Sequence, residues 1–284
     1  MAPHRPSLPP TASLLAKDAG SVFLRPHPPS QPEPLMRLIP LCAAALLGSL
    51  PLLPGAASAE MTQAEREAFR AEVRAYLLEN PEILVEALNE LDQRQQAQQA
   101  DADGAKLSQF GDQIFKDTAS WVGGNPSGDI TVVEFLDYRC GYCRKANAEV
   151  EELVKSDGNI RFVVKEFPIL GDESVLASRF AISVLQLAGP EAYKKVHDRL
   201  ITLRGAMNDE TLGRVADDLK LDRKAILARM SSKEVTAVID ANHQLGTALD
   251  ISGTPTFVVD RTLVRGYVPL DGMRQIVEGQ RKDG

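Results

Sequence analysis

The sequence predicts an α/β fold in which two small units of strands and helices are separated by a block of helices. Residues 130–137 and 160–167 are rich in β-branched and aromatic side chains and flank a stretch with helical periodicity, which predicts a strand–helix–strand unit. Residues 173–248 then follow helical periodicity almost throughout, and two short strands and a helix come after them. The strand–helix–strand order implies a right-handed connection and a parallel pair of strands.

The composition is that of an ordinary globular protein. The chain of 284 residues is 44% hydrophobic and 25% charged, and it is long enough for one large or two small domains. A net charge of −7 argues against nucleic acid as a partner. No stretch is long and apolar enough to be a clear membrane span, so we expect no membrane insertion once the N-terminal segment described next is removed.

The first 59 residues are expected to be absent from the exported protein. Residues 1–35 contain nine of the 18 prolines and should be disordered. Residues 36–59 match a secretory signal peptide: Met36-Arg37, then an apolar run, then Ala57-Ser58-Ala59. A signal acts from the N-terminus, so we expect Met36 to be the true start, residues 1–35 to be a gene-start artefact, and the product to reach the periplasm. The alternative is an uncleaved anchor, which the prolines of this short run disfavour.

Residues 60–104 are predicted to form a helical module followed by a polar connector. Thr62 and Glu65 have the spacing of a capping box, and Asn80-Pro81 should end this first helix and start a second with Asn80 as its N-cap. The connector, 93–104, is mostly glutamine, alanine and aspartate. Each helix carries an apolar stripe at helical spacing: Phe69, Val73 and Leu77, then Leu84, Leu88 and Leu91.

These two helices are too short to make a core alone. Their stripes must therefore pack on the main domain or on copies of the chain, and we expect self-association through residues 60–92.

The remaining predicted elements are, in order, a helix at 105–118, a turn at 125–128, a strand at 130–137, a helix after Cys140, a strand at 160–167, helices over 173–248, a strand beginning at Thr254-Pro255, a strand at Leu263-Val264, and a helix over about 270–280.

Two cysteines, Cys140 and Cys143, lie where the first strand runs into a helix. Unpaired backbone N–H groups and the helix dipole favour negative charge there, so Cys140 should ionise with a pKa of roughly 3.5–7.5 instead of about 8.5. A thiolate attacks disulfides, and a second nearby thiol resolves the mixed disulfide. Removal of residues 1–59 also removes Cys42, which leaves this pair without any disulfide framework and indicates that it serves chemistry.

Metal binding is the alternative use of such a pair. Zinc would need a second pair or added histidines, and His197 and His243 lie in predicted helices where we expect them to be surface or hydrogen-bonded residues. Copper(I) held by two thiolates remains an open alternative, because soft ligands suit that ion.

The order of elements and the Cys140-Gly141-Tyr142-Cys143 motif resemble the thioredoxin-fold disulfide oxidoreductases of the DsbA family, over residues from about 119 to 282. The Gly-Tyr dipeptide resembles that of periplasmic disulfide isomerases. Residues 79–84 resemble the N-terminal region of the suppressor-of-copper-sensitivity ScsC proteins, which can trimerise. The resemblance implies a thioredoxin domain over 105–284, with a helical domain of about 173–248 inserted between its βαβ and ββα halves.

The resemblance also implies further site residues. Glu134 would be a buried acid that accepts a proton from the resolving thiol, with Lys165 as its paired base. Thr254-Pro255 would be a cis-proline pair that faces the cysteines and binds the substrate backbone. A solvent-exposed Glu134 at a sheet edge and an ordinary trans proline are the alternatives. Gly141 and Tyr142 are expected to contact substrate.

The function implied is a periplasmic thiol–disulfide oxidoreductase that needs no metal or organic cofactor. We expect a disulfide isomerase or reductase that acts on disulfide-containing or misfolded exported proteins as a homo-oligomer, a trimer. A membrane thiol reductase, or an oxidase, would reset its redox state. The alternatives are a monomeric DsbA-like dithiol oxidase and a copper-binding stress protein.

Overall fold

The computed structural model describes residues 60–283. The expected disordered start and signal peptide, 1–59, lie outside these described residues. Within them, no helix is both long enough and apolar enough to cross a membrane.

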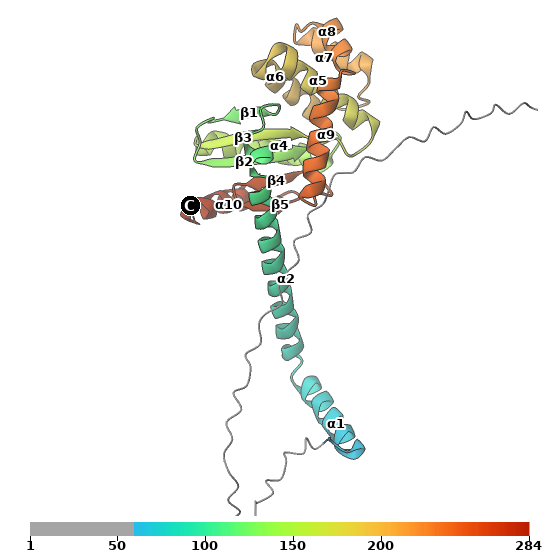
Figure 1. The fold of residues 1–284 in the computed structure, drawn as a ribbon, viewed down its shortest axis with the longest axis vertical. Coiled ribbons are helices and arrows are strands. Elements are labelled where there is room, and N and C mark those ends of the chain that lie inside the picture. The colour runs from blue at the N-terminus through green and yellow to red at the C-terminus, as the bar shows by residue number, and fades with distance from the viewer. Residues whose placement is uncertain (1–59, 284) are drawn as a thin grey trace, which may run out of the picture. The chain divides into compact units, whose positions relative to one another are not determined.

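A five-stranded sheet carries the described fold (Figure 1), in the order β1-β3-β2-β4-β5. The parallel pair predicted from the sequence is confirmed: β2 and β3 run side by side from Ile130 beside Ile160. The other neighbours are antiparallel. The strands are β1 (Trp121–Gly124), β2 (Ile130–Leu136), β3 (Ile160–Glu166), β4 (Thr256–Val259) and β5 (Thr262–Arg265).

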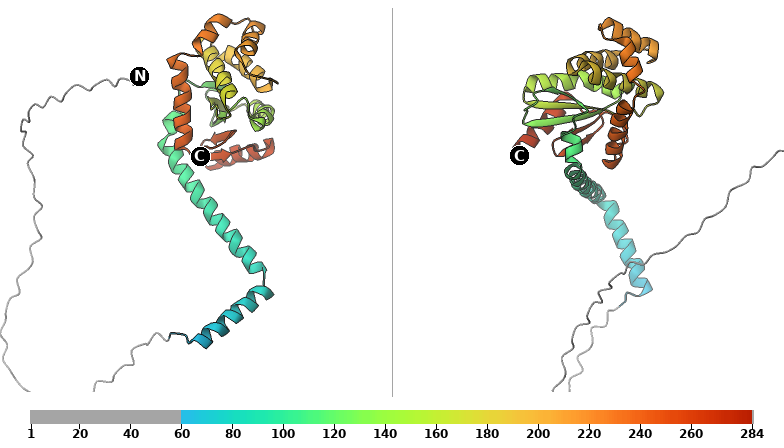
Figure 2. Two further views of the ribbon diagram at one scale, coloured as in Figure 1. Left: turned by 90° about the vertical axis from the view of Figure 1, so that its right-hand side faces the viewer. Right: turned by 45° about the horizontal axis from the view of Figure 1, so that its top comes forward.

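Helices connect and cover these strands. The crossover helix α4 (Gly141–Asp157) joins β2 to β3, and α10 (Leu270–Asp283) follows β5. The predicted helical block between β3 and β4 is confirmed, and its helices gather beside the sheet (Figure 2). They are α5 (Asp172–Ala188), α6 (Pro190–Thr202), α7 (Asp209–Asp218), α8 (Arg223–Arg229) and α9 (Lys233–Ala248).

The two faces of the sheet belong to different hydrophobic cores, because successive side chains of a strand point to opposite faces. Val132 and Val164 face a large core that includes α4, α10 and most of the helical block. Val133 and Val163 face a smaller core with α3 (Gly111–Phe115) and the end of α9. The face on which a residue lies therefore decides which groups it can reach.

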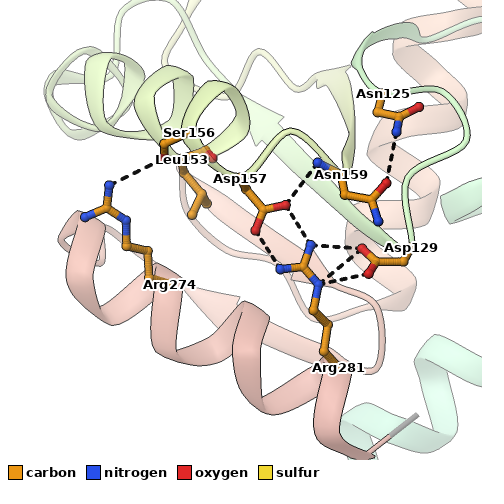
Figure 3. A network of polar contacts seen from close by, with 8 residues as sticks. All are labelled: Asn125, Asp129, Leu153, Ser156, Asp157, Asn159, Arg274 and Arg281. Atoms are coloured by element: carbon orange, nitrogen blue, oxygen red, sulfur yellow. Dashed lines mark hydrogen bonds and ion pairs between the residues drawn. The ribbon is translucent and has the colours of Figure 1, made fainter.

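The last turn of α10 is tied to both ends of the strand–helix–strand unit. Arg281 reaches Asp129, just before β2, at 2.9 Å and Asp157, the last residue of α4, at 2.6 Å. Figure 3 shows this guanidinium between the two carboxylates, and Arg274, about two turns earlier in α10, donates to Ser156. These contacts hold α10 against the helix whose first turn carries the cysteines.

The N-terminal helix α1 (Gln63–Glu79) begins as predicted. Thr62 and Glu65 form both hydrogen bonds of the capping box, at 3.3 and 2.8 Å. Asn80, expected to cap the second helix, instead closes the first, because its side-chain amide donates to the Tyr76 carbonyl at 2.8 Å. All residues of the two apolar stripes except the half-buried Leu77 are exposed in this single chain, and Phe69 is 60% exposed.

The polar stretch predicted as a connector, 93–104, is helical. It lies inside one helix, α2 (Glu82–Gln109), which also takes up the start of the helix expected at 105–118. Glutamine and alanine are good helix formers, and the C-terminal part of α2 is fastened to the edge strand β5. Asp103, which is buried, accepts two hydrogen bonds from Arg265 at 2.6 and 2.9 Å, and Lys106 pairs with Asp250.

Candidate active site

Cys140 is the N-cap of α4, as the sequence predicted, and its sulfur receives the backbone N–H of Cys143 at 3.4 Å. The Cys140 thiol also lies 3.0 Å from the Thr254 carbonyl oxygen. Both cysteines are reduced in this structure and both are buried, Cys143 completely. The first sulfur therefore faces the surface loop of Thr254, whereas the second lies beneath it.

The two thiols have opposite acidities. The Cys143 S–H group and the backbone N–H groups of Cys143 and Tyr142 lower the pKa of Cys140 to about 5, against the effect of burial. The pKa of Cys143 is raised, because its proton is held by Cys140 and because it is buried close to Glu134. Cys140 is thus charged at neutral pH and Cys143 keeps its proton.

Glu134 lies inside β2 with 2% of its surface exposed, so it is not the solvent-exposed edge residue of the alternative interpretation. Among the described residues, none offers a hydrogen bond to its Oε1. Burial, together with the negative charges of Cys140 and Glu166, raises the pKa of Glu134 to about 8. Glu134 therefore holds a proton at neutral pH in the reduced protein.

Lys165 does not pair with Glu134, contrary to what the family resemblance implied. The parallel register places Val164, not Lys165, beside Glu134. Successive side chains alternate between faces, so Lys165 points to the opposite face of the sheet. There its ammonium donates to Asp117 at 2.8 Å, and its side chain is only 1% exposed. The expectation that it helps to deprotonate Cys143 is wrong for this arrangement.

The Thr254-Pro255 peptide bond is cis, and the pair immediately precedes β4. The Pro255 carbonyl accepts the N–H of Gly266 at 2.9 Å, which joins this loop to the end of β5. The Thr254 hydroxyl is buried without a partner among the described residues. Its carbonyl, by contrast, is aimed at the Cys140 sulfur.

A pair of stacked tyrosines, Tyr142 and Tyr267, lies next to the cysteine motif. Tyr142 is 63% exposed, and its ring stacks on that of Tyr267 with centroids 6.4 Å apart. The Lys145 ammonium lies 4.1 Å from the Tyr267 ring centroid, and the Tyr267 hydroxyl donates to Glu149 at 2.7 Å. Tyr267 was not identified from the sequence, because it follows β5 and lies more than a hundred residues from the motif.

A second buried acid, Glu166, was also not identified. It ends β3, and three hydroxyl groups donate to it: Tyr138 at 2.8 Å, Tyr193 at 2.6 Å and Ser178 at 2.7 Å. A carboxylate in the strand 160–167 was the only sequence signal for it. Its three donors come from separate elements, which the periodicity of the sequence cannot place.

Neither His197 nor His243 has a hydrogen bond or a ring contact with the cysteines. His197 is buried between the Tyr138 hydroxyl at 3.3 Å and Asn147 at 3.1 Å, and burial lowers its pKa to about 4. His243 contacts the Pro168 carbonyl at 3.1 Å. Both are hydrogen-bonded helix residues, as expected. Across residues 60–283, no three His, Cys, Asp or Glu side chains gather in a way that could hold a metal ion.

Comparisons with known proteins identify the family of this domain. The family model described as a DSBA-like thioredoxin domain matches residues 131–278, and the model described as the copper resistance protein ScsC N-terminal domain matches residues 65–98. A solved thioredoxin-like oxidoreductase from Silicibacter pomeroyi DSS-3 is 42% identical, covers 60% of this chain and 97% of its own, and superposes with a TM-score of 0.57. Proteus mirabilis ScsC in a transitional conformation is 27% identical over 80% of this chain and 100% of its own, with a TM-score of 0.59.

Curated sequences give a similar result. The thiol:disulfide interchange protein DsbA of Bordetella pertussis is 29% identical over 134 residues, which are 46% of this chain and 64% of its own length. The chain also matches sodium/proton antiporters from Salinispora tropica and Salinispora arenicola at 29% identity, but it spans only 24% of their length. The similarity to these longer proteins is confined to one part of them.

Proposed function

Because the chain belongs to the family of DSBA-like thioredoxin domains, we propose that it is a thiol–disulfide oxidoreductase of exported proteins that works through Cys140 and Cys143. One observation carries the proposal: the two thiols have been driven apart in acidity, with a thiolate at the helix N-terminus and a protonated thiol beneath it. Such a pair has a nucleophile ready at neutral pH and a resolving thiol that does not compete for the same disulfide.

In the reductive direction, the Cys140 thiolate attacks one sulfur of a substrate disulfide. A Cys140–substrate bond forms, the substrate S–S bond breaks, and the other substrate sulfur leaves as a thiolate. Cys143 then loses its proton and attacks the Cys140 sulfur, which forms the Cys140–Cys143 disulfide and releases the second substrate thiolate. The substrate gains two electrons and the protein loses two. If a substrate thiol resolves the mixed disulfide instead, the disulfide is moved and no net electrons are transferred.

Glu134 is proposed as the group that takes the proton from Cys143. In the reduced protein the Cys140 charge helps to keep Glu134 protonated. Formation of the mixed disulfide removes this charge, so the pKa of Glu134 falls and the carboxylate becomes available at the moment when Cys143 must be deprotonated. Lys165, which lies on the other face, has no part in this step.

Substrate binding is proposed for the surface around Cys140. The Thr254 carbonyl beside the sulfur and the cis-Pro255 that follows it would align the substrate backbone, which gives broad specificity. Gly141 and the exposed Tyr142 form the adjoining wall, with Tyr267 stacked behind. The exposed Tyr142 ring, with the half-buried Tyr267 ring stacked on it, suits apolar side chains next to the substrate cysteine.

We further propose that the protein is exported to the periplasm and works as a trimeric disulfide isomerase or reductase, kept reduced by a membrane thiol reductase. The ScsC-type N-terminal domain and its exposed apolar stripes support this. A dithiol oxidase is the second candidate, and the acidity of Cys140 favours it, because stabilisation of the reduced form makes a disulfide a stronger oxidant.

The test of the proposal is the trapping of mixed disulfides. Cys143→Ala should accumulate covalent complexes with client proteins on non-reducing gels, because attack proceeds and resolution cannot. Cys140→Ala should accumulate far fewer, since the remaining thiol is buried and protonated. Equal trapping by both variants, or by neither, would contradict the assigned roles.

A further inference from the structure

The buried acid Glu166 has the surroundings of a charged group. Tyr138 and Tyr193 donate to one of its oxygens and Ser178 to the other, all within 2.8 Å, and its surface is 3% exposed. Hydroxyl groups that all point at one carboxyl stabilise its ionised form, because a carboxylate only accepts hydrogen bonds. Glu134 differs, because its Oε1 lacks any donor among the described residues.

The two acids lie on the same face of the sheet. Glu134 pairs with Val164 and Leu136 pairs with Glu166 in the parallel register, so the carboxyl groups are diagonal neighbours on adjacent strands. Both face the core that contains Cys140 and Cys143. Two carboxyl groups this close in an apolar region do not ionise independently, since the first charge raises the cost of the second.

We propose that Glu166 is a positioning residue of the redox reaction: it carries the single negative charge of a buried acid pair and thereby keeps the proton on Glu134 until Cys140 is consumed in a mixed disulfide. This inference rests on the proposed function. It assigns different tasks to the two acids, with Glu166 as a fixed charge and Glu134 as the group that exchanges its proton.

The electrostatics of the pair agree with this division. Burial raises the pKa of both acids, to about 8 for Glu134 and about 7 for Glu166, and in Glu166 the hydroxyl donors act against burial. The charge of Asp137 also raises the pKa of Glu166. The three hydroxyl donors of Glu166, and the lack of a donor to Oε1 of Glu134 among the described residues, favour ionisation of Glu166 before Glu134.

The tyrosine and histidine side chains that surround Glu166 stay neutral at physiological pH. The pKa values of Tyr138 and Tyr193 are raised by burial and by Glu166, so both remain donors. His197 behind Tyr138 is neutral at physiological pH, because burial lowers its pKa to about 4. The charges that raise the pKa of Glu134 in the described part of the chain are those of Cys140 and Glu166.

A carboxyl titration of the full chain tests the proposal without relying on activity. The protein is labelled with carbon-13 at the glutamate side-chain carboxyl, kept reduced, and titrated by NMR; Glu134→Gln identifies the signal of Glu134. Glu166→Gln is nearly isosteric and keeps an acceptor for the tyrosines. It should lower the midpoint of Glu134 by about 1 pH unit or more, because a like charge is removed. The control Glu152→Gln, which removes an exposed charge from α4, should leave the midpoint unchanged.

The same variants are then compared in the resolution step. A peptide is joined to Cys140 as a mixed disulfide, and its release by Cys143 is measured against pH. Release should rise with pH as Glu134 ionises, and the midpoint should move to lower pH in Glu166→Gln. An unchanged Glu134 midpoint in both experiments overturns the inference about Glu166. Failure of the wild type to form the mixed disulfide overturns the proposed function instead, while the NMR titration still decides the inference.

Ser178→Ala provides a second variant in case Glu166→Gln does not fold. Loss of one donor should raise the midpoint of Glu166, the lower of the two buried carboxyl midpoints, because its ionised form is less stabilised. If the lower midpoint stays where it is, the charge does not reside on Glu166 and the inference is overturned.

Discussion

The Cys140 sulfur obtains its charge from very local contacts. Its stabilising donors are the first-turn N–H groups of α4 and the S–H group of Cys143, which is the largest single contribution to its lowered pKa. The resolving cysteine thus activates the attacking one before it ever forms a bond to it. A substitution of Cys143 should therefore reduce the fraction of Cys140 that is ionised, even though Cys140 itself is unchanged.

We predict that Cys143→Ala raises the pKa of Cys140 by about 1 unit or more, because the S–H donor is lost. The pKa should nevertheless stay below that of a free thiol, since the backbone N–H donors remain. Thiolate absorbance against pH, with Cys143→Ser as a variant that keeps a donor, measures both effects. Identical midpoints in the wild type and Cys143→Ala would show that the thiol–thiol contact has no influence.

We predict that Glu134→Gln stabilises the reduced protein at pH 8 but not at pH 4. The pKa of Glu134 is raised from 4.5 to about 8 on folding, so between these values the unfolded state binds fewer protons than the folded state. The free energy of unfolding of the wild type therefore falls as pH rises through this window.

Glu134→Gln should abolish the contribution of Glu134 to this decrease in the free energy of unfolding, which is roughly 2–4 kcal/mol near pH 8. Glu166 contributes a slope of the same sign that remains in the variant. Urea denaturation at both pH values measures the change, with Glu152→Gln as the control. Equal destabilisation of Glu134→Gln at both pH values would mean that the residue has only a packing role.

The sequence could specify some site residues and not others. Local sequence features predict the positions of four of them. The cysteines lie at a helix start, Glu134 lies in a buried strand, and Pro255 lies at a strand start. Lys165 was misplaced because a shift of one residue along a strand exchanges the two faces of the sheet.

Among the elements, long periodic helices and apolar strands could be predicted. The edge strand β1 was not, because its four residues, Trp-Val-Gly-Gly, have no alternation and pair only through tertiary context. The sequence predicts a connector for the polar part of α2, because this stretch has almost no apolar residues that could pack against a core. In the structure a polar contact takes the place of apolar packing: the buried Asp103 accepts two hydrogen bonds from Arg265.

We predict that this ion pair holds the C-terminal turns of α2 on the sheet edge. Arg265→Ala should leave Asp103 without its main donor, and backbone amides around residues 99–107 should then exchange hydrogen about 10-fold faster. Arg261→Ala, a change of an exposed arginine in the same hairpin, serves as the control. Unchanged protection in Arg265→Ala would assign the docking of α2 to Leu107 and its apolar neighbours alone.

The continuous helix changes how the whole molecule should be divided. Residue 105, the boundary expected from the sequence, falls inside α2 and beyond Asp103, so a chain that starts there would lose the Asp103–Arg265 contact. A chain that starts at Gln95 would keep it and still lack both apolar stripes. It is the better truncation for separating assembly from disulfide chemistry.

Assembly itself is the last prediction. The apolar side chains of α1 and α2 are exposed in the single chain, among them Leu84 at 51% and Leu88 at 61%. Exposed stripes at helical spacing are stabilised by pairing with stripes of the same kind. The full exported chain should therefore be an oligomer, a trimer, and Leu84→Gln with Leu88→Gln should dissociate it. Glu86→Gln with Gln93→Ala changes the opposite face of α2 and should leave the assembly intact.

Assembly and isomerase activity should be lost together, because several active sites on one particle convert later contacts with a misfolded client into intramolecular events. Light scattering and refolding of a scrambled disulfide substrate are measured on the two double variants and on the chain starting at Gln95. The stripe variant and the truncated chain should be monomers that still exchange dithiols but refold the substrate poorly. If the wild type is itself a monomer, or if its dissociated forms refold the substrate equally well, the isomerase proposal fails. The dithiol oxidase, which the low pKa of Cys140 favours, is then the function that the site supports.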